Sequence, residues 1–230
     1  LNGTAEKASP DTIAPKVVAY LNEVETPEYG VVGRTPTLIA DISDDSGINT
    51  AGTSIGHDIE LTLDDDLSST VSLNEHFTYA PGSYNSGQLV YRLPTLSPGF
   101  HTMTLRVWDV NNNSTTQRLG FIVSDGAGQG TRVYSTVNPA STHTTFVAGF
   151  PTVGENEATI VWEVFDRTGK PIWTKHNTIA AKSGTAAVAW NLRSNDGLLS
   201  PEGVYVVKAT LKANGQKAQQ ATQKLIIVRP

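Results

Sequence analysis

Hydrophobic and polar residues alternate with a period of two in short runs along most of this chain, and turn residues separate the runs. Met103, Leu105 and Val107 show the pattern clearly, and residues 160–164 repeat it in the second half. Because successive side chains on a strand point to opposite faces, each run predicts a strand with one buried and one solvated face. We expect strands and turns, with no convincing helix, from residue 16 onwards.

The spacing of these runs predicts an all-β protein with two immunoglobulin-like β-sandwich domains in tandem. Seven short strands fall within residues 14–123, a density typical of immunoglobulin-like sandwiches. The Cys-Trp-Cys signature of antibody domains is absent, so the prediction depends on strand count and patterning. A second set of strands begins near residue 132 and follows the same logic, without a detectable sequence repeat of the first.

Two linkers set the predicted domain boundaries. Residues 126–130 are small and Gly-rich, and they separate an accessory domain, residues 14–125, from a second domain, residues 131–230. Residues 1–13 lack an apolar period and are interpreted as a linker from an upstream region, so we expect a fragment of a longer protein. No apolar run approaches the roughly 20 residues of a membrane-spanning helix, and no signal peptide opens the chain.

The net charge of −5 conceals a difference between the two halves. Residues 14–125 carry 5 basic and 14 acidic residues, whereas residues 126–230 carry 11 basic and 6 acidic residues. Either the two domains simply have different surfaces, or the basic half faces an anionic partner or surface. Nucleic-acid binding is not expected, because no basic stripe with interleaved aromatic residues is present.

A β-hairpin is predicted at the C-terminal end, from Gly203 through a turn at residues 214–215 to an aliphatic run at residues 224–228. Nothing in the sequence follows that could cover the last strand, so its edge is predicted to be a docking or recognition site. The candidate partner-docking residues are Gly203, Tyr205, Lys224, Leu225, Ile226, Ile227, Val228 and Arg229.

No catalytic residue is predicted in this chain. It contains no cysteine, so a cysteine nucleophile and a Cys-ligated metal are both excluded from these residues. The five histidines are scattered singly, and none belongs to a nucleophile motif.

No cofactor is predicted, with calcium as the weaker alternative. Calcium prefers clustered oxygen ligands, and acidic residues lie at several predicted strand ends, although at no fixed ligand spacing. The candidate calcium ligands are Asp41, Asp44, Asp45 and Asp109. Exposed aromatic side chains such as Trp108 or Trp173 could bind sugar, because basic residues lie beside them.

Several motifs carry a resemblance to a known family. Residues 38–50 read Leu-Ile-Ala-Asp-Ile-Ser-Asp-Asp-Ser-Gly-Ile-Asn-Thr and continue to Gly-His-Asp-Ile at 56–59, while residues 99–114 contain Gly-Phe-His-Thr, Trp-Asp-Val and Asn-Asn-Ser. These stretches resemble the region after the peptidase domain in the PorU family, the sortases, or C-terminal signal peptidases, of the type IX secretion system.

The second domain resembles a type IX C-terminal sorting domain. The similar motifs are Asn138-Pro139, Asp-Arg-Thr-Gly-Lys at 166–170, Asn-Asp-Gly at 195–197, Gly-Val-Tyr at 203–205 and Lys-Leu-Ile-Ile-Val at 224–228. Two departures are present. The usual aromatic-rich Asn-Pro-Asn-Pro-Phe neighbourhood is reduced to Ser-Thr-Val-Asn-Pro-Ala, and the chain ends in Arg-Pro rather than the more typical lysine.

The resemblance implies a parent that is a gingipain-like cysteine peptidase at the cell surface, on the outer membrane of a Gram-negative bacterium. Such a parent removes sorting domains from secreted cargo and attaches anionic lipopolysaccharide. The catalytic Cys and His of the family lie upstream, so no catalytic residue transfers to this chain. The implied role is a non-catalytic C-terminal region that anchors the peptidase to an outer-membrane β-barrel shuttle of the PorV type. Other subunits of the surface attachment complex are further candidate partners.

Two alternatives stay open from the sequence. The chain could be the C-terminal tail of a type IX cargo protein, whose sorting domain is recognised and removed during export. It could instead be an adhesin-like module that binds sugar or calcium through the acidic loops of the first domain.

Overall fold

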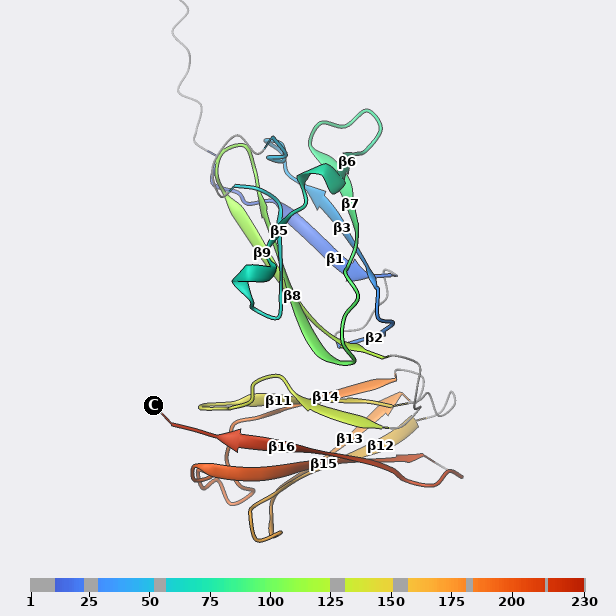
Figure 1. Ribbon diagram of the computed structural model, residues 1–230, viewed down its shortest axis with the longest axis vertical. Coiled ribbons are helices and arrows are strands. Elements are labelled where there is room, and N and C mark those ends of the chain that lie inside the picture. The colour runs from blue at the N-terminus through green and yellow to red at the C-terminus, as the bar shows by residue number, and fades with distance from the viewer. Residues whose placement is uncertain are drawn as a thin grey trace, which may run out of the picture. The chain divides into compact units, whose positions relative to one another are not determined.

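The computed structural model describes residues 11–22, 29–51, 57–124, 131–150, 157–180, 184–213 and 215–229 (Figure 1). Most of the predicted 1–13 linker, the whole 126–130 linker and the first residue of the 214–215 turn lie outside these described residues. Within them the predicted all-β class is confirmed. The helical elements described are two single turns of 3-10 helix, η1 at Leu67–Ser69 and η2 at Asn74–His76.

The described residues divide into two compact units. The first contains those within 1–26, 35–96 and 101–120, and the second contains those within 27–34, 97–100 and 121–230. The predicted boundaries, 14–125 and 131–230, stay a prediction because the linker between them is outside the described residues.

In the described parts of residues 16–123, nine strands form two sheets. The four-stranded sheet has the order β1-β3-β7-β6, with β1 at Lys16–Leu21, β3 at Thr37–Ser43, β7 at Ser86–Arg92 and β6 at Phe77–Tyr79. The five-stranded sheet has the order β2-β9-β8-β4-β5, with β2 at Val31–Val32, β9 at Ser114–Val123, β8 at Gly99–Trp108, β4 at Glu60–Leu63 and β5 at Val71–Ser72.

The alternation in β8 confirms the predicted strand face. Met103, Leu105 and Val107 are fully buried, whereas the intervening side chains are partly exposed. Leu38 in β3 and Leu89 in β7 are buried in the same way. The period-two pattern therefore supplies the hydrophobic core of the first unit.

Seven strands described between residues 132 and 227 form two further sheets, which lie in the second unit. The three-stranded sheet has the order β10-β11-β14, with β10 at Arg132–Ser135, β11 at Thr144–Gly149 and β14 at Thr185–Trp190. The four-stranded sheet has the order β13-β12-β15-β16, with β13 at Pro171–Ala180, β12 at Glu157–Phe165, β15 at Gly203–Ala213 and β16 at Gln219–Ile227.

Aromatic side chains from both sheets meet in the core of the second unit. Phe146 of β11 lies 5.7 Å from Trp190 and 6.4 Å from Trp162 between ring centroids, and both pairs are stacked. Trp173 of β13 packs against the same group, with its ring centroid 5.9 Å from that of Trp190. These aromatic rings therefore contribute much of the hydrophobic core between the two sheets.

Candidate docking site and acidic cluster

The predicted C-terminal hairpin is present as β15 and β16, which pair antiparallel from Gly203 opposite Ile227 to Leu211 opposite Gln219 (Figure 1). Gly203 has a φ of +149°, a conformation that glycine adopts readily because it has no Cβ. Gly215 in the turn has a φ of +75°. Glycine at the start of β15 and in the turn that follows β15 therefore allows backbone conformations that other residues rarely adopt.

Tyr205 ties β15 to the loop that precedes it. Its hydroxyl donates to the carbonyl oxygen of Pro201 at 2.7 Å while its ring is buried, the arrangement of the tyrosine corner of immunoglobulin-like sandwiches. Burial raises the pKa of Tyr205, and the nearby Asp166 carboxylate raises that pKa further. The phenol therefore stays a neutral hydrogen-bond donor.

The residues after β16 are fixed to the same loop. The guanidinium of Arg229 donates through Nη2 to the carbonyl oxygen of Ser200 at 2.6 Å, and the backbone N–H of Arg229 donates to Glu202 Oε1 at 2.9 Å. Residues 200–205 and the C-terminal segment are consequently one structural unit.

The outer edge of β16 is covered, which corrects the prediction that nothing closes it. Asn138 donates through Nδ2 to the carbonyl oxygen of Lys224 at 2.9 Å and accepts the N–H of Ile226 on Oδ1 at 3.0 Å. Ala140 then donates its N–H to the carbonyl of Ile226 and accepts the N–H of Val228. We call these four hydrogen bonds the Asn138 clasp.

The clasp works because an Asn amide carries the same donor and acceptor as a peptide group. Its side chain can therefore pair with a strand edge in place of a neighbouring strand. Further along β16, Ser135 donates to Gln223 Oε1 at 2.9 Å and Thr131 donates to Gln219 Oε1 at 3.0 Å. An added strand could not pair with the backbone of residues 224–228 without displacing the clasp.

The predicted docking residues of β16 divide between two faces. Leu225 and Ile227 are buried in the core, whereas Lys224 and Val228 are exposed and Ile226 is partly exposed. Side chains on the exposed face remain available to a partner, and the core residues act only by holding the strand in place. The docking assignment itself stays a prediction.

A groove of about 990 Å³ lies beside this hairpin. The turn between β12 and β13 forms one wall, and the loop from Ser194 to Gly203 forms the other. Sixteen residues line it: Asp166, Arg167, Thr168, Lys170, Pro171, Ile172, Ser194, Asp196, Leu198, Leu199, Ser200, Pro201, Glu202, Gly203, Val204 and Tyr205. Gly203 and Tyr205 were predicted from the sequence. The other fourteen were not, although two adjacent leucines in a turn-rich loop were a signal.

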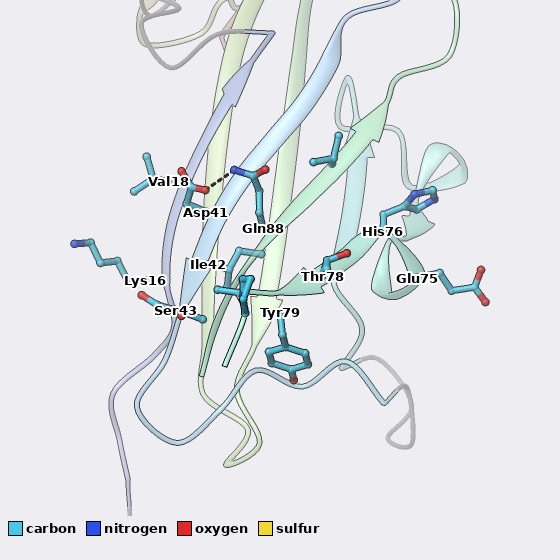
Figure 2. Close-up of a pocket in the computed structure, with 15 residues that line it drawn as sticks. Lys16, Val18, Asp41, Ile42, Ser43, Glu75, His76, Thr78, Tyr79 and Gln88 are labelled. Atoms are coloured by element: carbon cyan, nitrogen blue, oxygen red, sulfur yellow. Dashed lines mark hydrogen bonds between the residues drawn. The ribbon is translucent and has the colours of Figure 1, made fainter. Parts of the chain in front are cut away.

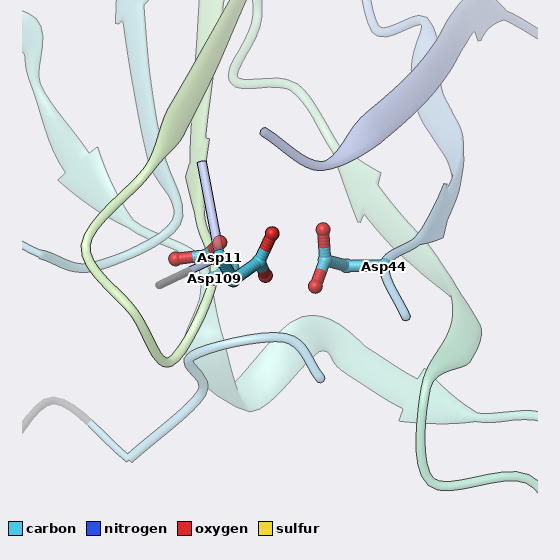
Figure 3. A group of neighbouring side chains, drawn as sticks. All are labelled: Asp11, Asp44 and Asp109. Atoms are coloured by element: carbon cyan, nitrogen blue, oxygen red, sulfur yellow. The ribbon is translucent and has the colours of Figure 1, made fainter. Parts of the chain in front are cut away.

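Three carboxylates gather in the first unit (Figure 3). One oxygen of each of Asp11, Asp44 and Asp109 lies within 4.8 Å of the others, and Asp44 and Asp109 are buried. Two of them were among the predicted calcium ligands, while Asp11 was missed because it lies in the predicted linker. Asp41 accepts a hydrogen bond from Gln88 instead, and neither Asp41 nor Asp45 belongs to the cluster.

The local turns explain how the cluster forms. Asp109 Oδ1 accepts the backbone N–H groups of Asn111 and Asn113, and Asp44 Oδ1 accepts the N–H of Ser46. Burial raises the pKa of Asp44, partly opposed by its hydrogen bond from the Ser46 N–H, and the charges of Asp109 and Asp11 raise it further. Clustered carboxylate oxygens of this kind are suited to a hard cation such as calcium.

A second groove, of about 950 Å³, lies on the four-stranded sheet of the first unit (Figure 2). Exposed Val18 and Val90 and the ring of Tyr79 alternate with polar groups, including the Asp41–Gln88 pair joined by a 2.9 Å hydrogen bond. A Cβ at Gly87 would collide with β6, so glycine there permits the close crossing that brings Tyr79 to the groove.

The aromatic residues predicted to bind sugar are engaged in packing. Trp108 has the Arg106 guanidinium 4.2 Å from its ring centroid and the His57 ring centroid also at 4.2 Å. Trp173 packs on the core of the second unit. Both side chains are nevertheless partly exposed, and Trp173 lines a groove of about 330 Å³, so sugar binding stays a prediction.

Histidine is paired with a carboxylate at one place in the described residues. Nδ1 of the buried His101 lies 2.7 Å from Asp64 Oδ2, and the adjacent N–H of Thr102 donates to Asp64 Oδ1. This arrangement holds the start of β8 against the turn after β4.

The described residues contain no helix long and apolar enough to span a membrane.

This chain is similar over its whole length to a solved bacterial protein. PorU from Porphyromonas gingivalis, solved in its dimeric latent form, is 27% identical with a TM-score of 0.51, and the match covers 100% of this chain and 22% of that chain. This chain therefore spans less than a quarter of the length of the protein it matches. No protein-family model matches the sequence, and no curated protein sequence matches it.

Two further solved structures are less similar to this chain. A β-glucuronidase from Parabacteroides merdae is 10% identical with a TM-score of 0.41, covering 94% of this chain and 25% of that chain. A tetra-tandem repeat in the extending region of a large adhesion protein is 16% identical with a TM-score of 0.33, covering 92% of this chain and 49% of that chain.

Proposed function

We propose that this chain is the non-catalytic C-terminal region of a PorU-like sortase of the type IX secretion system. Its first domain is an immunoglobulin-like accessory domain, and its second is a sorting-type domain that anchors an upstream cysteine peptidase to an outer-membrane β-barrel of the PorV type. The observation that carries this proposal is the match to PorU over the full length of the chain.

The motifs that resemble a sorting domain support the proposal because they act together. Asn138 pairs with β16, Tyr205 fixes the loop before β15, and Arg229 fastens the C-terminal segment to that loop. Motifs spread over residues 138–229 thus build one end of one sandwich. Because the chain has no cysteine, the peptidase nucleophile of the parent lies outside these residues.

At the cell surface, the parent would remove sorting domains from cargo and attach anionic lipopolysaccharide. The 230 residues would hold it at the barrel without taking part in that chemistry. The excess of basic residues in the second half is consistent with an anionic partner or surface.

Binding of the purified 230-residue chain to a purified PorV-type barrel in nanodiscs tests the anchoring role. We expect saturable binding by bio-layer interferometry, with an unrelated outer-membrane barrel as the control. Deleting residues 224–230 would be a poor test, because it removes the buried Leu225 and Ile227 from the core. Equal responses on the two barrels would contradict the proposal.

A pair of surface substitutions makes the test specific to the second domain. Lys224→Glu with Val228→Asp changes the exposed face beside the C-terminal end and should weaken binding. Lys16→Glu with Val18→Asp is the matched control on an exposed strand of the first unit. A loss of binding in the control pair alone would place the contact in the first domain and contradict the assignment.

Mass spectrometry of the mature surface protein separates a sortase tail from a cargo tail. The proposal requires the two domains to remain joined. Cleavage within residues 126–130 during export would instead identify a cargo protein whose sorting domain is removed.

A further inference from the structure

The outer edge of β13 is covered only at its start. Asn195 accepts the N–H of Thr174 on Oδ1 at 3.1 Å, and its own N–H donates to the carbonyl oxygen of Ile172 at 3.0 Å. Backbone groups of a strand point alternately to its two sides, so those of His176 and Thr178 point outward as those of Thr174 do. The outward N–H and C=O groups of His176 and Thr178 have no hydrogen-bond partner among the described residues.

This open stretch of β13 can pair with another strand. Unpaired N–H and C=O groups on an edge strand are a template for an extended chain. Both His176 and Thr178 are exposed, and β13 is ten residues long. The other edge strand of the same sheet is β16, and the Asn138 clasp occupies its backbone over residues 224–228. An occupant with an extended backbone is therefore favoured at β13.

The charge around this edge is positive. Residues 171–191 contain two lysines and one histidine, with no aspartate or glutamate. Lys175 is exposed, and it has no salt bridge to any residue that the structure describes. On the neighbouring β12, Glu163 is already paired with Lys208 at 2.6 Å, and Glu157 lies opposite Ala180 at the far end of β13. A carboxylate on an occupant would thus meet a positive charge that is not neutralised locally.

A groove of about 330 Å³ lies beside the same part of β13. Lys175 lies on the same face of the strand as Trp173, which packs on the hydrophobic core. The groove is lined by His143, Trp173, Lys175, Ala189, Trp190 and Asn191, so its described lining contains no acidic side chain. Side chains of opposite charge that face each other across two paired strands stabilise the pairing. An acidic side chain on an added strand would have Lys175 as such a partner.

We propose that the outer edge of β13 pairs with an extended, acidic segment of the barrel partner. The N–H and C=O groups of His176 and Thr178 bond to the backbone of that segment, and a carboxylate of the segment lies beside Lys175. This proposal rests on the proposed anchoring function. It adds a backbone contact that the covered edge of β16 does not offer.

Thr178→Pro tests the backbone contact against the same nanodisc-embedded barrel. Proline has no N–H to donate, and it is tolerated on an edge strand where the N–H faces solvent. We expect the full 230-residue chain to bind about tenfold more weakly or worse, with little change in thermal stability. Thr178→Ala keeps the N–H and is the matched control, which should bind as wild type does.

A charge reversal tests the acidic character of the occupant. Lys175→Glu should weaken binding about fivefold or more and reduce the salt dependence of binding. Lys217→Glu is its control, because Lys217 is exposed in the turn between β15 and β16. Equal affinities for the two variants would contradict the acidic occupant.

Hydrogen exchange detects the contact without any substitution. The amides of His176 and Thr178 should exchange more slowly when the barrel is bound, because their N–H groups then have acceptors. The amide of Lys217 should exchange at the same rate with and without the barrel.

The outcomes distinguish the two proposals. If the wild-type chain binds the barrel, Thr178→Pro binds as Thr178→Ala does and neither edge amide gains protection, the edge proposal is wrong and the anchoring function stands. If the wild-type chain does not bind the barrel, both are wrong. Self-association of the chain in sedimentation velocity that Thr178→Pro abolishes would make a second copy the occupant, which would overturn the pairing with the barrel.

Discussion

The Asn138 clasp gives the sharpest test of how this fold closes its last strand. Asn138→Ala removes two hydrogen bonds to β16, one from Nδ2 to the Lys224 carbonyl and one from the Ile226 N–H to Oδ1. Each hydrogen bond contributes about 1 kcal/mol net. Because both lie at an exposed edge, water can replace part of that contribution, so the expected loss is about 1–2 kcal/mol.

Tryptophan fluorescence during urea unfolding suits this measurement, because three of the four tryptophans lie in the second half of the chain: Trp162, Trp173 and Trp190. For a domain of this size, a loss of 1 kcal/mol corresponds to a fall in melting temperature of about 4–8 °C. Asn191→Ala is the control, since Asn191 is exposed on the same unit. We expect the control to stay within about 0.5 kcal/mol of wild type.

Hydrogen exchange locates the effect. The amide of Ile226 should exchange faster in Asn138→Ala, while the amide of Val228 stays protected as long as Ala140 remains in place. Asn138→Asp keeps the acceptor and loses the donor, so it should retain protection at Ile226 and lose only the bond to Lys224. If Asn138→Ala matched Asn191→Ala in stability and Ile226 kept its protection, the clasp would not stabilise the edge.

Three further predictions concern other parts of the molecule. Gly87→Ala should destabilise the first unit by about 1–3 kcal/mol in calorimetry, because its Cβ would collide with the backbone of β6; Gly33→Ala meets nothing and should be near neutral. Tyr205→Phe should cost about 1 kcal/mol and reduce the loss of stability at alkaline pH. The raised pKa of Tyr205 makes the folded state hold that proton more tightly, so the contribution of Tyr205 to stability is lost as pH rises above 10; the pKa of Tyr20 is also raised, so a smaller alkaline loss remains in the variant. Asp44→Asn should stabilise the chelator-treated protein at pH 7. The pKa of Asp44 is raised in the folded state, so the charged carboxylate destabilises the fold increasingly as pH rises above 3.8, and Asn carries no such charge. If calcium instead raises the melting temperature of wild type and not of Asp44→Asn, the cluster binds calcium; no calcium effect on either protein would refute the calcium hypothesis.

Much of the fold could be predicted from local pattern. The buried faces of β8 and β12 follow from the two-residue spacing of Met103 and Leu105 and of Ile160 and Trp162, because strand geometry places every second side chain on one face. The hairpin followed from its glycine and from the aliphatic closing run. These features depend on residues close together in the chain.

The candidate site could be predicted only in part. Gly203 and Tyr205 were identified, but the closing of the β16 edge depends on Asn138, 86 residues before Lys224 in the chain. Calcium candidates Asp44 and Asp109 meet Asp11, which has no strand pattern around it. The free edge inferred from the end of the chain was therefore wrong for residues 224–228.

The sequence by itself determined the all-β class and the alternating core faces, because a two-residue period expresses itself within one strand. Only the tertiary structure decided which backbone edge is covered, which carboxylates meet and where a groove opens. Those features depend on the positions of loops far apart in the chain. Hydrogen bonds from Asn138, Tyr205 and Arg229 set those positions in the second unit. These hydrogen bonds cannot be predicted from the hydrophobic periodicity of any one strand.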